Sequence, residues 1–567
     1  MTMLRFILNG SVGMALFFSP PLFGQTSQPA PVSAAPPPVV ATNPARSVDE
    51  VADRLIRNEH ALRRRLLTVH PVLETYIQEL KPDPELGAVP KSDIYFLGKL
   101  AINRGEGQQS LIPAPWLGKR VMERVSSVFS GRFLPNGFAE MVVLSYHFDK
   151  AHYNFEFVKR EFLGDVRCLV LNVVPKQHDH GLFIGRIWVE DAGYNIVRMD
   201  GTFISPPTAQ SYVHFDSWRI NAGPNLWLPA DIYTEEGDMP HGLFRAVRFK
   251  GQTRLWGYEA GKNNSNEQFT DLVVDAPQQV SDQSASASDA APVEAERLWE
   301  RQAEDNVLDR LQKAGLLAPT GDVDKVVQTV LTNLQITNKI NLQPAVRARI
   351  LLTTPLECFT VGHTVVISRG LLDVLPDEAS LAAVLAHELA NIDLGYAVNT
   401  KYAFADRLFF PDTAVLKKLK LTESPAEETA ANQKSLEILK NSPYDQKLPQ
   451  FGLFLRALNA RSKDMPNLIH PLFGNRMAQP GKVLELAALM ENSPQLKPRS
   501  MEQVPALPLG GRIRLDPWTD QLELKREGNP PLQFAREKLS FEVTPFFLHL
   551  SREPEVEQAA NNKVEGE

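Results

Sequence analysis

Residues 276–293, a stretch rich in Ser, Ala, Gln and Asp, divide the chain into two parts with different hydrophobic periods. Before this stretch, apolar and polar residues alternate in short runs, which is typical of strands with one buried face. After it, apolar residues recur at helical spacing. The chain of 567 residues is also too long for one ordinary domain. We therefore predict an α+β protein in which a β-rich domain, residues 47–275, and a mainly helical domain, residues 294–500, are joined by the linker 276–293.

Both ends of the chain are predicted to lie outside these two domains. Residues 1–24 combine Arg5 with a short apolar stretch broken by proline, which is typical of a secretory signal peptide. An uncleaved N-terminal anchor is the alternative. Residues 25–46 form a Pro/Ala-rich spacer, residues 501–550 a C-terminal extension with a β-hairpin, and residues 551–567 a disordered polar tail. We expect an exported protein, periplasmic or extracellular, that is soluble after signal-peptide cleavage.

The β-rich domain is predicted to be an antiparallel meander or half-barrel behind a helical lead-in. The lead-in includes a short helix over Val72–Leu80. Further on, Leu182–Glu190 and Ile196–Phe203 flank a turn sequence and predict a hairpin. In the segments Gly185–Val189 and Ile196–Arg198, this hairpin resembles the half-barrel of periplasmic lipoprotein-sorting proteins. The resemblance implies a concave face that holds acyl chains, and a packed sheet without a ligand is the alternative.

Charge and cysteine count exclude several classes of function. The formal net charge is -7, without the basic surface that nucleic-acid binding requires, so we expect no nucleic-acid partner. The chain has two cysteines, Cys168 and Cys358, one in each predicted domain. Two cysteines exclude a disulfide framework and a cysteine-ligated zinc site. We expect both to be buried thiols.

The segment 381–391, L-A-A-V-L-A-H-E-L-A-N, is the strongest chemical signal in the chain. His387 and Asn391 are four residues apart, so on a helix their side chains project from the same side. In zinc peptidases this spacing is H-E-x-x-H, in which two imidazoles hold the metal and the glutamate acts as general base. Here His387 and Glu388 are present, but Asn391 stands where the second histidine would be.

Four segments occur in the order found in metallopeptidase family forty-eight, the CAAX prenyl protease type, and residues 322–477 resemble that family. The segments are V-V-I-S-R-G-L-L at 365–372, P-D-E-A-S-L-A-A-V-L-A-H-E at 376–388, E-T-A-A-N at 428–432, and I-H-P at 469–471 followed by Arg476. The resemblance implies a zincin-like peptidase domain with a small edge sheet. It also implies extracytoplasmic polypeptides as partners, because exported bacterial members act in outer-membrane protein quality control.

The resemblance gives roles to individual side chains. They are the metal ligands His387 and Glu428, the general base Glu388, the oxyanion-stabilising His470, and the cleft residues His363 and Arg476. His363 precedes the strand that we expect to border the cleft, and an exposed turn is the alternative for it.

The departures from the family fall on the metal site. Asn391 replaces a histidine ligand, and an amide oxygen is a poor, neutral donor for zinc. Catalytic zinc normally has three protein ligands plus water, whereas His387 and Glu428 supply two. Asn432 also replaces an acidic residue of the third segment. We therefore expect zinc binding to be weakened or lost, and the sequence leaves open whether the chain is an enzyme.

Three functions fit these observations. The one we favour is binding of unfolded or extended polypeptide in a degenerate zinc-peptidase cleft of the cell envelope, by a pseudopeptidase or weak peptidase that uses the edge strand at 364–368 for strand addition. The second is an active zinc metalloendopeptidase in envelope protein quality control. The third is a carrier of lipid or lipoprotein through the N-terminal β domain.

Overall fold

The computed structural model of this protein describes most of the region from residue 45 to residue 552. The described residues are 45–84, 86–100, 109–110, 141–179, 181–204, 211–238, 249–258, 292–395, 421–500, 502–503, 505–524 and 539–552. The predicted signal peptide, the spacer to residue 44, the linker to residue 291 and the tail from residue 553 lie outside them. Within the described part, no helix combines the length and the apolar character that crossing a membrane requires.

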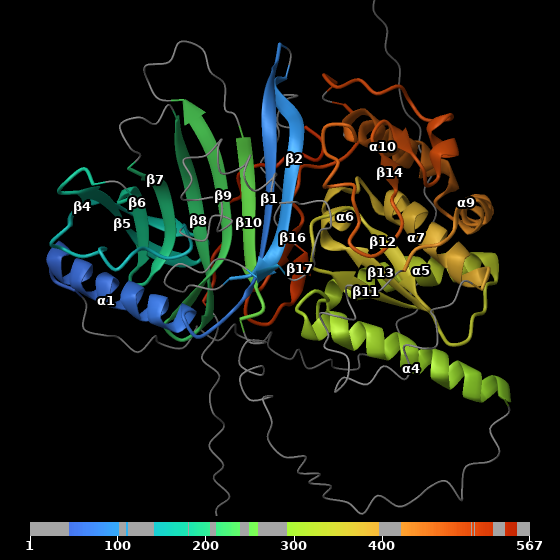
Figure 1. Cartoon of the computed structure of the whole chain (residues 1–567), viewed down its shortest axis with the longest axis horizontal. Helices are drawn as coiled ribbons and strands as arrows, with labels where there is room; N and C mark the ends of the chain where they lie inside the picture. The colour runs from blue at the N-terminus through green and yellow to red at the C-terminus, as the bar shows by residue number, and fades with distance from the viewer. Residues whose placement is uncertain are drawn as a thin grey trace, which may run out of the picture. The chain divides into compact units, whose positions relative to one another are not determined.

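The part before the linker is one antiparallel sheet of ten strands, in the order β3-β2-β1-β10-β9-β8-β7-β6-β5-β4 (Figure 1). The predicted antiparallel meander is confirmed, since strands from β4 to β10 pair in sequence order. The strands are β1 (Val72–Asp83), β2 (Gly87–Lys99), β3 (Gln109–Ser110), β4 (Tyr153–Leu163), β5 (Val166–Pro175), β6 (Phe183–Glu190), β7 (Ile196–Phe203), β8 (Ser211–Gly223), β9 (Leu226–Asp238) and β10 (Phe249–Trp256).

The short helix predicted over Val72–Leu80 is wrong, because these residues form most of β1. The strand pairs with β2 on one side and β10 on the other, and its residues from Val72 to Gln78 are all buried. A strand buried on both faces shows no strict alternation of apolar and polar residues. Its β-branched and aromatic residues, such as Thr75 and Tyr76, favour the extended conformation.

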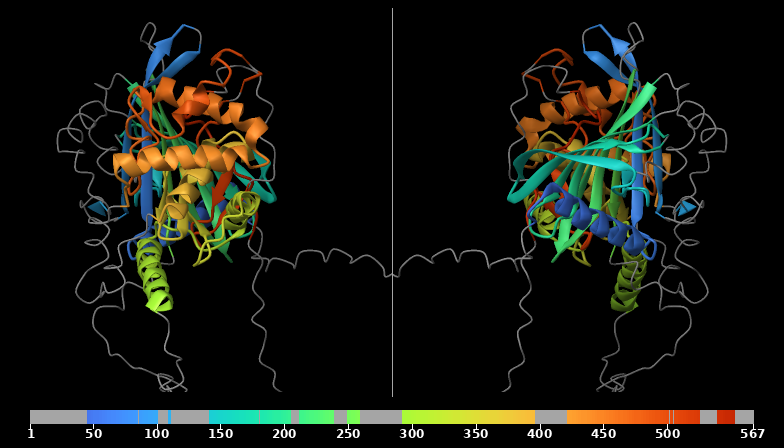
Figure 2. Two further views of the ribbon diagram at one scale, coloured as in Figure 1. Left: turned by 90° about the vertical axis from the view of Figure 1, so that its right-hand side faces the viewer. Right: turned by 90° about the vertical axis from the view of Figure 1, so that its left-hand side faces the viewer.

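Helix α1 (Val48–Leu66) crosses one face of the sheet (Figure 2, right). It begins after Ser47, whose hydroxyl accepts a hydrogen bond from the N–H of Glu50. Its buried face, including Leu55, packs in one apolar cluster with Leu73 and Ile77 of β1. Since this cluster is separate from the core of the helical part, α1 gives the face of the sheet that it covers a core of its own.

The part after the linker is mainly helical around a small sheet in the order β11-β13-β12, which confirms the predicted α+β class. Its helices are α4 (Pro292–Lys313), α5 (Asp322–Asn338), α6 (Arg369–Val374), α7 (Glu378–Asp393), α9 (Pro425–Lys440), η4 (Asp445–Lys447), α10 (Leu448–Arg461) and η5 (Ala487–Met490). Its strands are β11 (Arg347–Leu351), β12 (Cys358–Val361), β13 (Thr364–Ser368), β14 (Ala478–Gln479) and β15 (Lys482–Val483).

The strand at 364–368 is the centre of the small sheet and not its edge. It pairs in parallel with β11 and antiparallel with β12. Both sides of its backbone are therefore occupied, and the predicted addition of a polypeptide strand to it is wrong. The spatial order of these strands leaves no signal in the sequence, because β13 lies between β11 and β12 in the sheet although β12 precedes it in the chain.

Buried polar contacts connect the large sheet to the helical part and to the C-terminal segment. Glu74 of β1 accepts hydrogen bonds from the N–H and hydroxyl of Thr354 at 2.6 and 2.8 Å, and from the guanidinium of Arg369 at 2.8 Å. The C-terminal segment contains the predicted hairpin as β16 (Ile513–Leu515) and β17 (Leu522–Leu524). Beyond it, the carbonyl of Phe541 and the N–H of Val543 bind the side-chain amide of Gln78.

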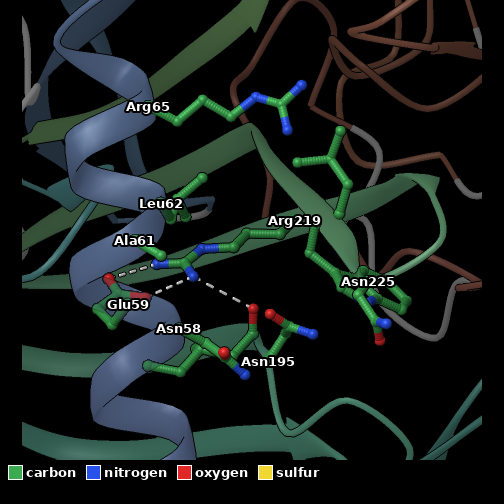
Figure 3. Close-up of a pocket in the computed structure, with 11 residues that line it drawn as sticks. Asn58, Glu59, Ala61, Leu62, Arg65, Asn195, Arg219 and Asn225 are labelled. Carbon is green, nitrogen blue, oxygen red and sulfur yellow. Dashed lines mark hydrogen bonds and ion pairs between the residues drawn. The ribbon is translucent and has the colours of Figure 1, made fainter.

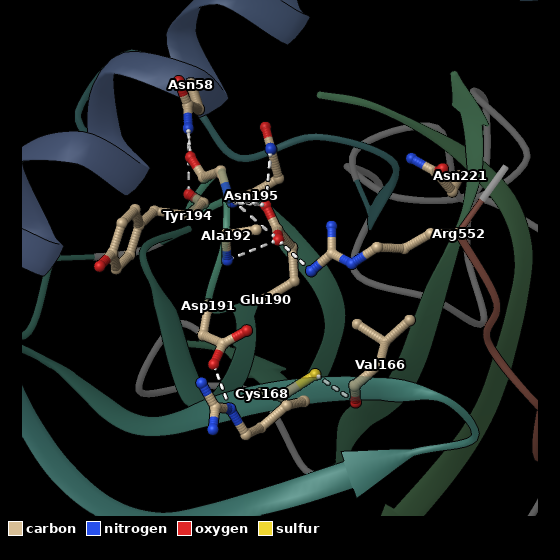
Figure 4. A network of polar contacts seen from close by, with 12 residues as sticks. Asn58, Val166, Cys168, Glu190, Asp191, Ala192, Tyr194, Asn195, Asn221 and Arg552 are labelled. Carbon is tan, nitrogen blue, oxygen red and sulfur yellow. Dashed lines mark hydrogen bonds and ion pairs between the residues drawn. The ribbon is translucent and has the colours of Figure 1, made fainter. Parts of the chain in front are cut away.

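The C-terminal segment also reaches the end of β6, where Arg552 meets Glu190 at 2.6 Å (Figure 4). The carboxylate of Glu190 accepts further hydrogen bonds from the N–H groups of Ala192, Gly193 and Asn195 in the turn after β6. Close by, Cys168 is a buried free thiol whose pKa burial raises to about 12. Cys358 is buried and free as well, so the prediction of two buried thiols is confirmed.

Candidate metal centre

Helix α7 carries the central residues of the site into the core. It begins after the N-cap Asp377, and every residue from Ala379 to Ile392 is buried. His387 and Asn391 are each 1% exposed. A helix that is buried on all sides is stabilised by its apolar residues, whereas polar side chains within it need partners inside the protein.

The partner of His387 comes from helix α9, which lies beside α7 (Figure 1). A capping box at Ser424 and Glu427 starts α9, and this places Glu428 in the first turn. Oε1 of Glu428 lies 3.2 Å from Nε2 of His387. The structure therefore brings together the two metal ligands that the resemblance implied.

A third residue, the acidic Glu485, joins this pair, and it is not among the site residues predicted from the sequence. Glu485 is 3% exposed and lies between β15 and η5. One potential ligand atom from each of His387, Glu428 and Glu485 lies within 4.8 Å of the other two. No motif marks Glu485 in the sequence, because it is far along the chain from both partners and outside the four family segments.

The geometry around His387 fits a bound metal ion. Among the described residues, neither ring nitrogen of His387 makes a hydrogen bond, although Nε2 lies 3.2 Å from Glu428. Two donor atoms on one tetrahedral zinc ion, with bonds of roughly 2.0–2.2 Å, lie roughly 3.3–3.6 Å apart. A buried imidazole at this distance from a carboxylate, and out of line for a hydrogen bond, is therefore suited to share a metal with it.

The electrostatics of the cluster also favour a cation. Burial lowers the pKa of His387, but the carboxylates of Glu388 and Glu428 outweigh burial and raise it well above its usual value. Burial raises the pKa of Glu485 well above its usual value, with Glu428 and Glu388 adding to the shift and His387 opposing it. Burial likewise raises the pKa of Glu423 to about 7, together with the charge of Glu388. Four carboxylates thus surround one histidine, and a cation would offset their mutual repulsion.

Two asparagines hold the acidic residues in place. Nδ2 of Asn432 donates to Oε1 of Glu428 at 3.2 Å, and its Oδ1 accepts from the N–H of Leu486 at 2.6 Å. Nδ2 of Asn475 donates to Oε2 of Glu428 at 2.8 Å and also to Glu423. Asn432 can bridge Glu428 and the segment of Glu485 because an amide both donates and accepts, which the family's aspartate could not do in its ionised form.

Asn391 contacts Glu388 in this structure. Its Nδ2 donates to Oε2 of Glu388 at 3.3 Å, while the other oxygen of Glu388 lies 3.5 Å from Nδ1 of His387. Among the described residues, Oδ1 of Asn391 has no hydrogen-bond partner. The amide therefore orients the proposed general base, as a neutral donor.

His470 is half-buried, and its Nδ1 lies 2.9 Å from the carbonyl of Pro471. Because a carbonyl oxygen only accepts, Nδ1 carries the hydrogen, and the neutral ring then presents Nε2 as an acceptor. Burial lowers the pKa of His470, and the charge of Arg476 adds to that shift. A neutral ring with its hydrogen on Nδ1 has an acceptor at Nε2, and protonation would give Nε2 the N–H that an oxyanion requires.

The two predicted cleft residues have different surroundings. Arg476 is exposed and directly follows Asn475, which contacts Glu428. His363 lies in the turn between β12 and β13, where its N–H donates to Glu304 of α4 at 2.6 Å. Its Nδ1 also lies 3.4 Å from that carboxylate. His363 therefore connects the small sheet to α4, and its place in a cleft stays a prediction.

A separate pocket lies between α1 and the large sheet (Figure 3). Its volume is about 210 Å³, below the roughly 300–1,000 Å³ of typical ligand sites. Polar side chains line much of it: Asn58, Glu59, Arg65, Asn195, Arg219 and Asn225. Arg219 donates two 2.7 Å hydrogen bonds to Glu59, so this pocket suits a small polar molecule better than an acyl chain.

Comparison with known proteins supports the peptidase assignment of the helical part. Residues 318–410 match the model of peptidase family M48, a match that includes α7 but ends before Glu428 and Glu485. No curated protein sequence is significantly similar to the chain. A solved domain of a proposed outer membrane lipoprotein-sorting protein from Vibrio parahaemolyticus is similar at 13% identity, covering 36% of this chain and 91% of that one, with a TM-score of 0.20. That score is too low to support an argument about the large sheet.

Proposed function

We propose that this chain is an exported, metal-dependent peptidase that binds extended polypeptide at the His387 cluster and cleaves it slowly. One observation carries the proposal: His387 of α7 lies 3.2 Å from Glu428 of α9, with Glu388 next to it in a segment that matches a peptidase family. The family match supplies the substrate class. Export rests on the signal-peptide-like sequence of residues 1–24.

The residues of the cluster divide the work of hydrolysis. A metal ion held by His387, Glu428 and a further donor would supply a Lewis acid for the peptide carbonyl. The amide of Asn391 orients Glu388 by a hydrogen bond of 3.3 Å. Glu388 would accept a proton from the attacking water. The side chain of Glu428 is 18% exposed, so a polypeptide would approach from its side of the cluster.

Binding without cleavage is the second candidate, and the state of His470 favours it. With Nδ1 bonded to the carbonyl of Pro471 and a lowered pKa, a neutral His470 offers no N–H toward an oxyanion. Loss of one such donor costs an enzyme about 10²–10³ in rate. A bound polypeptide would then usually dissociate before it is cleaved.

Cleavage of an unfolded protein separates the two candidates. We expect the purified mature protein with zinc to cut fluorescently labelled casein, and we expect a chelator or the variant Glu388→Gln to reduce the rate at least about 100-fold, because the general base is lost. Glu437→Gln, on the exposed side of α9, is the matched control and should keep the rate. Saturable casein binding without cleavage would favour the second candidate, and neither binding nor cleavage would refute both.

A lipid carrier function through the β domain stays a prediction without support from a described pocket. The pocket between α1 and the sheet is small, and charged and amide side chains form part of its lining. The apolar residues under α1 pack against one another.

A further inference from the structure

We infer that Glu485 is the third metal ligand of the site and takes over the role that Asn391 does not fill. The inference rests on the proposed metal-dependent function. It concerns a residue outside the segments that resemble the family and outside the matched range 318–410. Among the described residues, one carboxylate oxygen of Glu485 lies within 4.8 Å of a donor atom of His387 and of one of Glu428.

The backbone around Glu485 is fixed in a way that directs this residue toward α7 and α9. The N–H groups of Leu484 and Glu485 both donate to the carbonyl of Met477, at 2.9 and 3.3 Å. The N–H of Leu486 donates to Asn432 at 2.6 Å. Leu486 has a φ of 52°, a left-handed conformation that is unfavourable for a side chain with a Cβ. The surrounding contacts therefore hold a strained turn directly after Glu485.

A second, independent observation points to a ligand at this place. The imidazole of His387 is 1% exposed, and within the described ranges neither of its nitrogens makes a hydrogen bond. Buried polar groups normally have a hydrogen-bond partner or bind a metal. The nitrogen Nε2 lies on the side of Glu428, which together with Glu485 completes a set of one nitrogen and two oxygen donors.

Asn391 is unsuited to compete for this role. Its amide group is engaged with Glu388 through Nδ2, and an amide oxygen carries no charge. A carboxylate binds zinc at roughly the same distance as imidazole does and adds a negative charge to the site. The loss of a histidine on α7 is thus offset by an acidic residue from a different segment of the chain, and three protein ligands are present again.

Metal binding to a set of variants tests this assignment. The proteins are the full mature chain and its variants Glu485→Gln, Asn391→His and the double variant. Glu423→Gln is the control for a neighbouring, partly buried carboxylate. We would titrate each with Zn²⁺ in a calorimeter. We would also record the visible spectrum with Co²⁺, whose band intensity reports coordination number. Circular dichroism of each protein checks folding.

The assignment predicts one zinc ion per wild-type chain and a loss of affinity of at least about 100-fold in Glu485→Gln. It predicts a clearly smaller loss in Glu423→Gln, which removes a neighbouring negative charge but no ligand atom. It also predicts recovery of most of the affinity in the double variant, because a histidine at 391 restores the third ligand. Unchanged zinc affinity and Co²⁺ spectrum in Glu485→Gln would overturn it. Equal losses in Glu485→Gln and Glu423→Gln would overturn it as well, since they would reflect general negative charge.

The result stays separable from the proposed function. Zinc bound through Glu485 in a protein that neither binds nor cuts casein would refute the peptidase proposal and leave the ligand assignment in place. Cleavage that persists in a Glu485→Gln protein with full zinc content would refute the ligand assignment and leave the peptidase proposal in place. A wild-type chain that binds no zinc at all would overturn the ligand assignment.

Discussion

Glu190 and Glu485 are both buried carboxylates, with 0% and 3% exposure, but their neighbours differ in kind. Glu190 is surrounded by donors: backbone N–H groups of the turn after β6, the amide of Asn195 and the guanidinium of Arg552. Burial raises the pKa of Glu190, but Arg552 and Asn195 outweigh burial and lower it. Burial raises the pKa of Glu485 well above its usual value; His387 opposes this shift, and the three neighbouring carboxylates Glu428, Glu388 and Glu423 add to it.

The difference separates a buried carboxylate that stabilises the fold from one that requires a bound proton or cation. A charge that meets five donors is already neutralised by the protein and stabilises the turn that it caps. A charge that meets other carboxylates is unfavourable until a proton or a cation arrives. The same residue type at the same burial is thus structural in the sheet and a candidate ligand beside α7.

The largest change in unfolding free energy is expected at Glu190, whose carboxylate is surrounded by hydrogen-bond donors. Glu190→Gln replaces an acceptor oxygen by an NH₂ group that faces N–H donors and leaves Arg552 without its charge partner, so we expect a loss of about 3 kcal/mol of unfolding free energy. Urea denaturation of the purified protein measures it. Arg167→Ala is the matched control, because Arg167 forms an ion pair with Asp191, the residue next to Glu190, and this pair is exposed. It should change stability by less than about 0.5 kcal/mol, and equal effects would contradict the comparison.

An intermediate change in stability is expected at Glu357, which has backbone N–H donors like Glu190 and a raised pKa like Glu485. Its carboxylate accepts from the N–H groups of Leu472 and Phe473 at 2.9 and 3.1 Å, yet burial raises its pKa from 4.5 to about 7. The folded state therefore holds this proton more tightly than the unfolded state. Stability from this group is present below pH 4.5 and is lost as the pH rises to about 7.

Glu357→Gln should remove this pH dependence, because glutamine does not titrate. Wild type should lose on the order of 2–3 kcal/mol relative to the variant between pH 5 and pH 8. Denaturation of both proteins at the two pH values measures the difference. Parallel stability curves would show that Glu357 keeps its ordinary pKa in the folded protein.

The smallest effect, with the opposite sign, is expected at Glu485 in a chelating buffer. Glu485→Gln removes one of four neighbouring carboxylates, so we expect a gain of about 1 kcal/mol in unfolding free energy at pH 8. Thermal unfolding in EDTA measures it. With excess zinc the order should reverse, since only the wild type gains binding energy from a third ligand. A loss of stability in EDTA would mean that Glu485 is a structural acid of the Glu190 kind.

The sequence predicts those parts of the molecule in which local signals agree with the fold. The capping residues Asp377 and Ser424 and the helical spacing after them mark α7 and α9, and the ordered family segments bring His387 and Glu428 together. The pair could be predicted because the resemblance assigns a ligand to one position in each of the segments 376–388 and 428–432.

Other features depend on contacts between distant segments and leave no local signal. Val72–Leu80 lacks alternation because β1 is covered on both faces, so its period does not distinguish a strand from a buried helix. The central position of β13 follows from a parallel pairing with β11. Glu485 reaches the site through a strained turn and the side chain of Asn432, and neither is visible in residue spacing.

The contact of Gln78 with the C-terminal segment has a consequence for the order in which the protein matures. Gln78 is completely buried in β1, and its amide is satisfied by the backbone of Phe541 and Val543, 463 and 465 residues later in the chain. A ribosome works from the N-terminus, so one of the first strands to be made is among the last to be completed. Any product that stops short of residue 541 keeps this amide without those partners, so β1 is complete only after residues 541–543 have been made.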